Sequence, residues 1–361
     1  MPPILRIAPV AFLVSTASAS TWRIETIAGT GVPGSGGDDG PASAAQINDP
    51  YGVVRGPDGA IWFCEHNGHR IRRIATDGTI TTVVGTGERG YEGDGGPATV
   101  ATLNLPHELR FDHAGNLYIA DTANHAVRRV NRETGIITTM AGCGARGYEG
   151  DGGPATQAKL SGPHSIQFGR DGELYVCDVG NHAIRVVDPL TGIIRTYSGT
   201  GRPGPSPDGS PITGTPLNNP RSLDVDSDGR LWLVTREGNQ VLMLDPRTNM
   251  IHHIAGTGEP GFTGNGGPAR LATLSGPKGI ALDREGNAWL ADTESHSVRV
   301  IRADTGTIEL MAGTGIASDG SDGDPLACAM NRPHGVFADQ DGSVFIGDSE
   351  AHRIRVLRRI R

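Results

Sequence analysis

Six residues that each follow a proline carry side chains able to do chemistry, and they recur every 56 or 57 positions. They are Tyr51, His107, His164, Arg221, Lys278 and His334. Three imidazoles at equivalent repeat positions can converge on one metal, and a catalytic zinc takes three protein ligands while keeping one position open. We therefore expect His107, His164 and His334 to hold a divalent ion, zinc before others. The alternative is three histidines that hydrogen bond to water.

The two cations of this set, Arg221 and Lys278, are neighbours in the repeat order. Adjacent cations favour an anionic substrate group such as a carboxylate or phosphate, which arginine can bind through two hydrogen bonds. The alternative is that they pair with acidic residues of nearby loops. Tyr51 falls between His334 and His107 in the same order, and its phenol is a candidate general acid or base.

A second loop position departs from the repeat in two units. Most units have Asp-Thr or a similar pair there, whereas the first has Glu65-His66 and the fourth has Arg236-Glu237. We expect Glu65 to support Tyr51 in proton transfer. Arg236 and Glu237 are expected to contact the substrate or to orient the first set.

The elements that must position these residues form a sixfold repeat. A motif ending in Gly-x-Gly recurs in steps of 56 or 57 residues, and a proline and a turn glycine stay in phase with it. Each unit holds four short β-rich runs bounded by turn residues; in the second unit they cover 108–112, 117–120, 126–130 and 136–140. Four strands per unit repeated around an axis is the arrangement of a β-propeller. We predict an all-β, six-bladed propeller.

In a propeller the first strand of each blade lines a central channel, so the six residues should form a ring at one mouth. The last unit contains only three strand-like runs. Residues 22–27 precede the first motif and supply the missing strand, which closes the propeller and removes an open sheet edge.

Other repeated residues are interpreted as structural. His69, His125, His182, His296 and His352 share one loop position, with Gln240 in the fourth unit, and we expect local hydrogen bonds from them. The aspartates at the start of that loop, such as Asp121, are expected to bond their own turn. The Gly-Asp-Gly-Gly-Pro loops lack the ligand count of a calcium loop and are interpreted as turns.

Composition limits the partners and the compartment. The formal net charge of −8 argues against nucleic acid or an anionic membrane as the main partner. None of the four cysteines forms a C-x-x-C pair. Arg6, a short apolar run and Ala17-Ser18-Ala19 resemble a signal peptide, so we predict residues 1–19 as a leader and 20–361 as one propeller, secreted or periplasmic. Otherwise the chain is cytoplasmic.

The loops that contain these histidines resemble NHL repeats, for example Asp121-Thr122-Ala123-Asn124-His125 and Asp292-Thr293-Glu294-Ser295-His296. The resemblance covers about residues 22 to 358 and implies the propeller fold. The three Pro-His pairs are similar to the zinc ligands of peptidyl-α-hydroxyglycine α-amidating lyase, which implies catalytic roles for Tyr51 and Arg221. Pro50-Tyr51-Gly52 and Trp62-Phe63-Cys64-Glu65 are similar to runs in streptogramin B lyase.

These observations favour a metal-dependent lyase, before a hydrolase, that acts in the channel on a small or peptide-like substrate with an anionic group. One alternative is a secreted binding module that uses the same ring or the outer loops to hold a ligand or a protein. Another is a structural repeat protein with a water-filled channel. There is no G-x-S-x-G, P-loop or H-E-x-x-H motif to support serine hydrolase, nucleotide or zincin chemistry.

Overall fold

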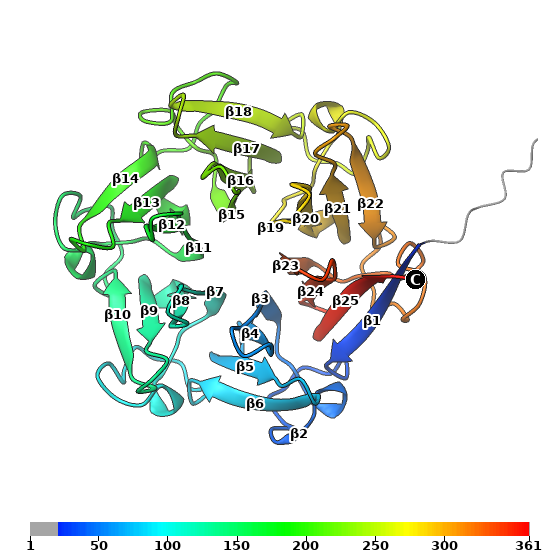
Figure 1. Cartoon of the computed structure of the whole chain (residues 1–361), viewed down its shortest axis with the longest axis horizontal. Helices are drawn as coiled ribbons and strands as arrows, with labels where there is room; N and C mark the ends of the chain where they lie inside the picture. The colour runs from blue at the N-terminus through cyan, green and yellow to red at the C-terminus, as the bar shows by residue number, and fades with distance from the viewer. Residues whose placement is uncertain (1–20, 361) are drawn as a thin grey trace, which may run out of the picture.

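Six antiparallel sheets, five of four strands and one of five, are arranged radially around a central axis, as the computed structural model shows for residues 21–360 (Figure 1). The predicted six-bladed propeller is therefore confirmed. Blades 1 to 6 are numbered from the sheet that carries Tyr51 to the sheet that carries His334. The predicted leader, residues 1–19, lies outside the described residues. Among residues 21–360, no helix has the length and apolar character needed to cross a bilayer.

Each blade runs from an innermost strand to an outermost strand. The innermost strands of blades 1 to 6 are β3 (Pro50–Arg55), β7 (Pro106–Phe111), β11 (Pro163–Phe168), β15 (Pro220–Val225), β19 (Gly279–Leu282) and β23 (Pro333–Ala338). The second strands are β4 (Ile61–Glu65), β8 (Leu117–Asp121), β12 (Leu174–Asp178), β16 (Leu231–Thr235), β20 (Ala288–Asp292) and β24 (Val344–Asp348).

The third strands are β5 (Arg70–Ile74), β9 (Ala126–Val130), β13 (Ala183–Val187), β17 (Gln240–Asp245), β21 (Ser297–Ile301) and β25 (Arg353–Arg359). The outermost strands are β6 (Thr79–Val84), β10 (Ile137–Ala141), β14 (Ile194–Gly199), β18 (Met250–Ala255), β22 (Ile308–Ala312) and β1 (Trp22–Ala28). A two-residue strand, β2 (Gly40–Pro41), pairs with β6. Seven single-turn 3₁₀ helices lie in the loops, at 42–44, 98–100, 122–124, 155–157, 179–181, 269–271 and 293–295.

The hydrophobic core lies between the blades. Ala120 and Val127 of blade 2 pack with Ile166 and Val176 of blade 3 in one buried cluster, and the other blade pairs repeat this arrangement. Face-to-face packing of alternating inward side chains is the usual way in which sheets bury apolar surface. Because each blade buries both faces, the strands keep their positions around the axis and hold the ring residues in register.

The first strand closes the propeller as predicted. β1 pairs antiparallel with β25, from Trp22 opposite Arg359 to Ala28 opposite Ile354 (Figure 1). The last sheet therefore combines the two ends of the chain.

The repeated loop histidines connect neighbouring blades. Each lies in the left-handed region, with φ between 48° and 52°, and its Nδ1 accepts a hydrogen bond from a backbone N–H that leads into the next blade. The counterpart in blade 4 is Asn239, not Gln240 as the sequence comparison suggested. Asn239 has φ of 47°, and its Oδ1 accepts from Gly276 N at 2.9 Å. Asparagine and histidine are among the non-glycine residues that tolerate this backbone region best.

The loop aspartates do more than bond their own turn. In blade 2, Asp121 is fully buried; its Oδ1 accepts from Asn104 N, and its Oδ2 lies 3.3 Å from the buried Arg128. The same buried acid–arginine pair recurs in four other blades, as Glu65–Arg72, Asp178–Arg185, Asp292–Arg299 and Asp348–Arg355. Blade 4 has Thr235 and Leu242 at these positions. Blade 4 is therefore built without the internal ion pair.

Candidate functional site

The six predicted ring residues begin the inner strands at one end of the channel. In five blades the preceding proline starts the strand, and its pairing with the second strand shifts register within the next three residues. Such bulges redirect side chains and are common beside active sites. Blade 5 differs because β19 starts only at Gly279, so Lys278 lies just before the strand.

Glycines in blade 6 bring its strands close to Tyr51. A Cβ at Gly335 would lie 2.1 Å from Tyr51 O, and one at Gly347 would lie 2.5 Å from the same oxygen. No larger residue fits at either position without moving the backbone. The position of Tyr51 is therefore fixed by backbone packing between blades 6 and 1.

The ring of Tyr51 lies between two imidazoles. It stacks on His334 with 4.0 Å between ring centroids and on His66 with 4.1 Å, and it meets His107 edge-on. Burial raises the pKa of Tyr51 to about 12, so the phenol carries its proton at neutral pH. His66 was not among the predicted site residues. The signal that would have found it is the contrast with Thr122, Thr293 and Ser349 at the same repeat position.

Backbone carbonyl groups fix the tautomers of three histidines. The Nδ1 atoms of His164, His334 and His66 lie 2.7, 2.8 and 3.2 Å from the carbonyl oxygens of Gly162, Arg332 and Pro106, and a neutral imidazole must donate there. Their Nε2 atoms then carry lone pairs. Burial, reinforced by nearby cations, lowers the pKa of His164 and His334 well below 6.5 and that of His66 to about 4. All three are neutral at pH 7.

Arg221 reaches from blade 4 to blade 2. Its Nη2 donates to His107 Nε2 at 3.0 Å, whereas its Nε and His107 Nδ1 have no hydrogen-bond partner within residues 21–360. In the same range no carboxylate lies within ion-pair distance of Arg221. Burial, followed by the charge of Arg236, lowers the pKa of Arg221 to about 10, so it stays cationic at neutral pH. A partly buried cation without a counter-ion favours binding of an anion.

Lys278, the other ring cation, is already neutralised. It is 3% exposed, and its Nζ donates to Glu294 Oε1 at 2.7 Å. Burial lowers the pKa of Lys278 to about 8. Burial opposes ionisation of Glu294 as well, but hydrogen bonds from Arg332 and Lys278 lower its pKa to about 2. Of the two predicted anion anchors, Arg221 is the one left without an acidic partner.

The remaining predicted residues lie off the ring. Glu65 is fully buried inside blade 1, where it pairs with Arg72 at 2.9 Å; burial raises its pKa to about 7. It is the blade 1 member of the repeated ion pair. Arg236 and Glu237 form a partly exposed pair with each other at 3.1 Å. Arg236 also lies 4.0 Å from Glu294.

The three predicted zinc ligands do not form a metal-binding arrangement as they stand. His107 lies 4.5 Å from His164 and 6.3 Å from His334, measured between ring centroids, and its Nε2 is bonded to Arg221. No group of three or more His, Cys, Asp or Glu side chains in the described part of the chain has the spacing of a metal site. A cation hydrogen bonded to the central imidazole competes with any metal for the same lone pair. The donor set therefore does not fit zinc in this arrangement.

The channel narrows sharply below the ring. A cavity of about 10 Å³ lies there, lined by His107, Glu108, Ser222 and His334 among others. A Cβ on Gly52 would lie 2.8 Å from Glu108 Cα, which shows how closely the inner strands approach. The ring is thus a shallow site at one mouth.

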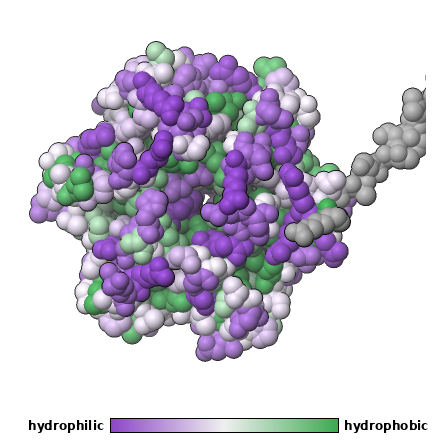
Figure 2. Space-filling model, in the orientation of Figure 1, coloured by the Kyte–Doolittle hydropathy of each residue, from purple (hydrophilic) through white to green (hydrophobic). Residues whose placement is uncertain are grey.

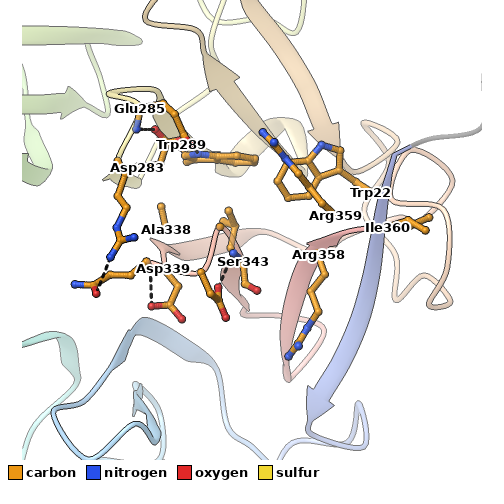
Figure 3. A pocket seen from close by; sticks show the side chains of 15 residues that line it. Trp22, Asp283, Glu285, Trp289, Ala338, Asp339, Ser343, Arg358, Arg359 and Ile360 are labelled. Carbon is orange, nitrogen blue, oxygen red and sulfur yellow. Dashed lines mark hydrogen bonds between the residues drawn. The ribbon is translucent and has the colours of Figure 1, made fainter.

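Two larger cavities lie at the other ends of the inner strands. One of about 410 Å³ is lined by Arg110, Gln167 and Asp224. The other, of about 780 Å³, lies between blades 5 and 6 and brings together Trp22, Trp289 and Arg359 with Asp283 and Asp339 (Figure 3). Hydrophilic residues dominate the face seen down the axis (Figure 2). Charges of both signs alternate in these cavities, and neither contains a ring residue.

Side chains from the second loop also join the blades at the ring. Thr122, Thr293 and Ser349 donate to the carbonyl oxygens of Pro163, Pro333 and Pro50 at 2.6 to 2.7 Å, and His66 bonds to that of Pro106. Blades 3 and 4 have Val179 and Arg236 at this position. Valine cannot donate, and Arg236 pairs with Glu237 instead. Both junctions of blade 4 therefore lack this hydrogen bond, and blade 4 is the one that carries Arg221.

Comparisons with known proteins agree with this fold. The family model for the NHL repeat matches residues 160–187, 274–301 and 330–357. Protein SUPPRESSOR OF QUENCHING 1, chloroplastic, of Arabidopsis thaliana is 28% identical over 289 residues, which is 77% of this chain but only 27% of the relative. The chain thus spans about a quarter of that relative's length.

Solved structures extend the comparison at low identity. An auxiliary nutrient binding protein from Bacteroides thetaiotaomicron matches with a TM-score of 0.69 and 16% identity over 93% of this chain and 76% of the other. Streptogramin B lyase matches with a TM-score of 0.55 and 16% identity over 93% and 97%. These likenesses establish the fold.

The fold and the ring together define a six-bladed β-propeller with an ionisable site at one mouth of its channel. More particularly, three of its blades match the NHL repeat, and each matched segment covers the first, second and third strands of its blade.

Proposed function

We propose that the ring is the active site of a lyase acting on a small or peptide-like substrate that carries an anionic group. The observation that carries this proposal is Arg221, a partly buried guanidinium that has no carboxylate partner among residues 21–360 and lies beside a protonated phenol and neutral imidazoles. The structural likeness to streptogramin B lyase supports the same class of reaction.

In the proposed reaction Arg221 binds the anionic group and orients the substrate across the channel mouth. His164 is half-buried, its Nε2 carries the lone pair because Nδ1 donates to Gly162 O, and the charge of Arg221 acts on it, so it is the candidate base. It removes a proton from the carbon next to the anionic group, and the C–H electrons form a new double bond. The bond to the leaving group breaks, and the leaving atom takes the proton of Tyr51. Solvent then returns the proton from the imidazolium to the phenolate, which completes the cycle.

One role in this proposal differs from the sequence expectation. His164 takes the place of Glu65 as the candidate base, because Glu65 pairs with Arg72 inside blade 1. A divalent ion at His107, His164 and His334 stays a prediction, and it requires Arg221 to leave His107 Nε2. When bound, such an ion would act as a Lewis acid on a substrate oxygen. No step of the proposed reaction depends on it.

The test is turnover of a panel of small and peptidyl carboxylates with a leaving group β to the carboxylate, run in ¹⁸O-labelled water. A lyase gives an unsaturated product without label, whereas a hydrolase incorporates one oxygen from water. Tyr51→Phe should lower kcat by about 10²- to 10⁴-fold, the usual contribution of a general acid. Tyr148→Phe, on an outer loop, is the matched control and should be unchanged. Labelled product, or an unaffected Tyr51→Phe variant, would contradict the proposal.

A further inference from the structure

The ring contains a resident cation at the place where the sequence suggested a metal. Arg221 crosses the channel mouth and binds the Nε2 lone pair of His107, the central one of the three predicted ligands. We infer that Arg221 takes the place of a metal ion in this chain, so that the ring binds a carboxylate or similar oxyanion without metal. The inference deepens the proposed function, on which its catalytic meaning rests.

The first support is the contact itself. A guanidinium cannot accept hydrogen bonds, so its bond to His107 Nε2 needs the imidazole lone pair, the same electrons that a zinc ion would need. The two uses exclude one another. His164 and His334 hold Nδ1 against backbone carbonyls and present Nε2, as metal-binding histidines do, but they supply only two ligands.

The second support is the charge balance of the mouth. Glu294 neutralises Lys278 and Arg332, Glu350 adds to Arg332, and Glu237 neutralises Arg236. Unlike Lys278, Arg332 and Arg236, Arg221 has no carboxylate partner among residues 21–360. An anionic ligand completes the balance and can use the guanidinium N–H groups that His107 leaves free.

The third support is the blade that carries Arg221, because this blade departs from the repeat. Blade 4 lacks the internal ion pair and both hydroxyl links to neighbouring prolines, so its departures from the repeat coincide with Arg221. Blade 2, which supplies His107, has the ion pair and a side-chain link at each junction, from the His66 imidazole and from the Thr122 hydroxyl. The arginine side chain is long enough to reach the opposite side of the mouth, whereas Lys278 stays at its own blade with Glu294.

Removing the arginine should therefore create the metal site. In Arg221→Ala, His107 Nε2 is released, and its lone pair can join the Nε2 lone pairs of His164 and His334. Arg146→Ala is the matched control, because it removes a loop arginine that bonds to Ser161 Oγ and is not one of the ring residues.

The experiment measures zinc by elemental analysis and zinc chloride titration, and oxyanion binding by titration with sodium sulfate in the presence of EDTA. The wild type should retain no stoichiometric zinc after dialysis and should bind sulfate with EDTA present. Arg221→Ala should bind about one zinc per chain and bind sulfate at least about tenfold more weakly, the loss expected for a charge-assisted bond. The zinc should be lost again in Arg221→Ala/His107→Ala. Arg146→Ala should stay zinc-free and change sulfate affinity by less than about threefold.

Two results would overturn the inference: stoichiometric zinc in the wild type that His107→Ala removes, or sulfate affinity that Arg221→Ala leaves intact. Folding of each variant is checked by its thermal transition, and Arg221→Lys provides a second variant that keeps the charge while losing the reach to His107. Failure of the proposed function has a different signature. If Arg221→Ala gains zinc and loses sulfate but no lyase substrate turns over, the inference stands without the function. If turnover is found and EDTA abolishes it, the function stands without the inference.

Discussion

Blades 2 and 4 are copies of one repeat, yet they hold their ring residues in different ways. Blade 2 has the buried Asp121–Arg128 pair and the Thr122 link to the next blade. Blade 4 has Thr235 and Leu242 in place of the pair and Arg236 in place of the link. Blade 4 lacks the polar groups that form the internal pair and the link in blade 2, and its ring arginine crosses the channel mouth instead. We infer that polar residues repeated in most blades stabilise the blades, whereas the residues that depart from the repeat are candidates for function.

The strongest test of this comparison removes one partner of the blade 2 pair. Arg128→Leu leaves Asp121 buried without its counter-charge, and we expect a loss of about 3–5 kcal/mol in the free energy of unfolding, measured with urea. The double variant Asp121→Thr/Arg128→Leu installs the blade 4 residues. It should be clearly more stable than the single variant, because a buried pair can be replaced by uncharged groups at little cost. If the double variant is as unstable as the single one, other contacts in blade 4 must replace the stability that the ion pair gives to blade 2.

Blade 5 provides a second test, because it keeps the internal pair and buries its ring cation. Burial lowers the pKa of Lys278 to about 8 in the folded protein, against 10.5 for an unperturbed lysine. The folded state therefore binds fewer protons than the unfolded state between these values, so stability should rise as pH increases from 8 to 10.5, by at most about 3 kcal/mol. Lys278→Met should flatten this dependence.

The titration of Lys278 can be followed directly, since the chain contains only two lysines. Isotope-labelled lysine gives one NMR signal for Lys278 and one for Lys159, which is exposed and paired with Glu149. The two signals should titrate at well-separated pH values, with Lys278 the lower. If both signals titrate above pH 10, the prediction is wrong, and the ion pair with Glu294 raises the pKa of Lys278 by more than burial lowers it.

The smallest expected effect concerns the links between blades. Thr122→Val removes the hydroxyl that donates to Pro163 O and should cost about 1 kcal/mol. Val179→Thr places a hydroxyl at the equivalent position of blade 3, opposite Pro220, and should change stability by less than about 1 kcal/mol, because a new bond offsets the lost apolar contact. Thermal unfolding of the two variants side by side measures the difference. If the two variants lose the same stability, the hydroxyl link does not account for the difference between the blade 2–3 and blade 3–4 junctions.

The fold and the ring positions were predictable because they follow from periodicity. A spacing of 56 or 57 residues fixes six blades, and the residue after each proline must then lie at equivalent points around the axis. The buried ion pairs were missed, although an acid and an arginine seven residues apart recur in five units, from Glu65 and Arg72 to Asp348 and Arg355. That spacing was a usable signal.

The bonding inside the ring was not predictable in the same way. The contact of Arg221 with His107 joins side chains from blades 2 and 4, and it depends on the rotamer of a long side chain that no periodicity determines. The stacking of His66 on Tyr51 depends in addition on a loop conformation at the junction of blades 1 and 2. Sequence therefore located the residues but not their mutual contacts.

The pairing of β1 with β25 sets when the ring can form during synthesis. Strand β1 is translated before β25, and blade 6 is complete only when the two have paired. Until then His334, and the glycines Gly335 and Gly347 that pack against Tyr51, belong to a sheet that lacks its outermost strand. Contacts of such long sequence separation form late. The nascent chain can therefore build blades 1 to 5 as it emerges, but it gains the complete mouth only after translation of the last strand.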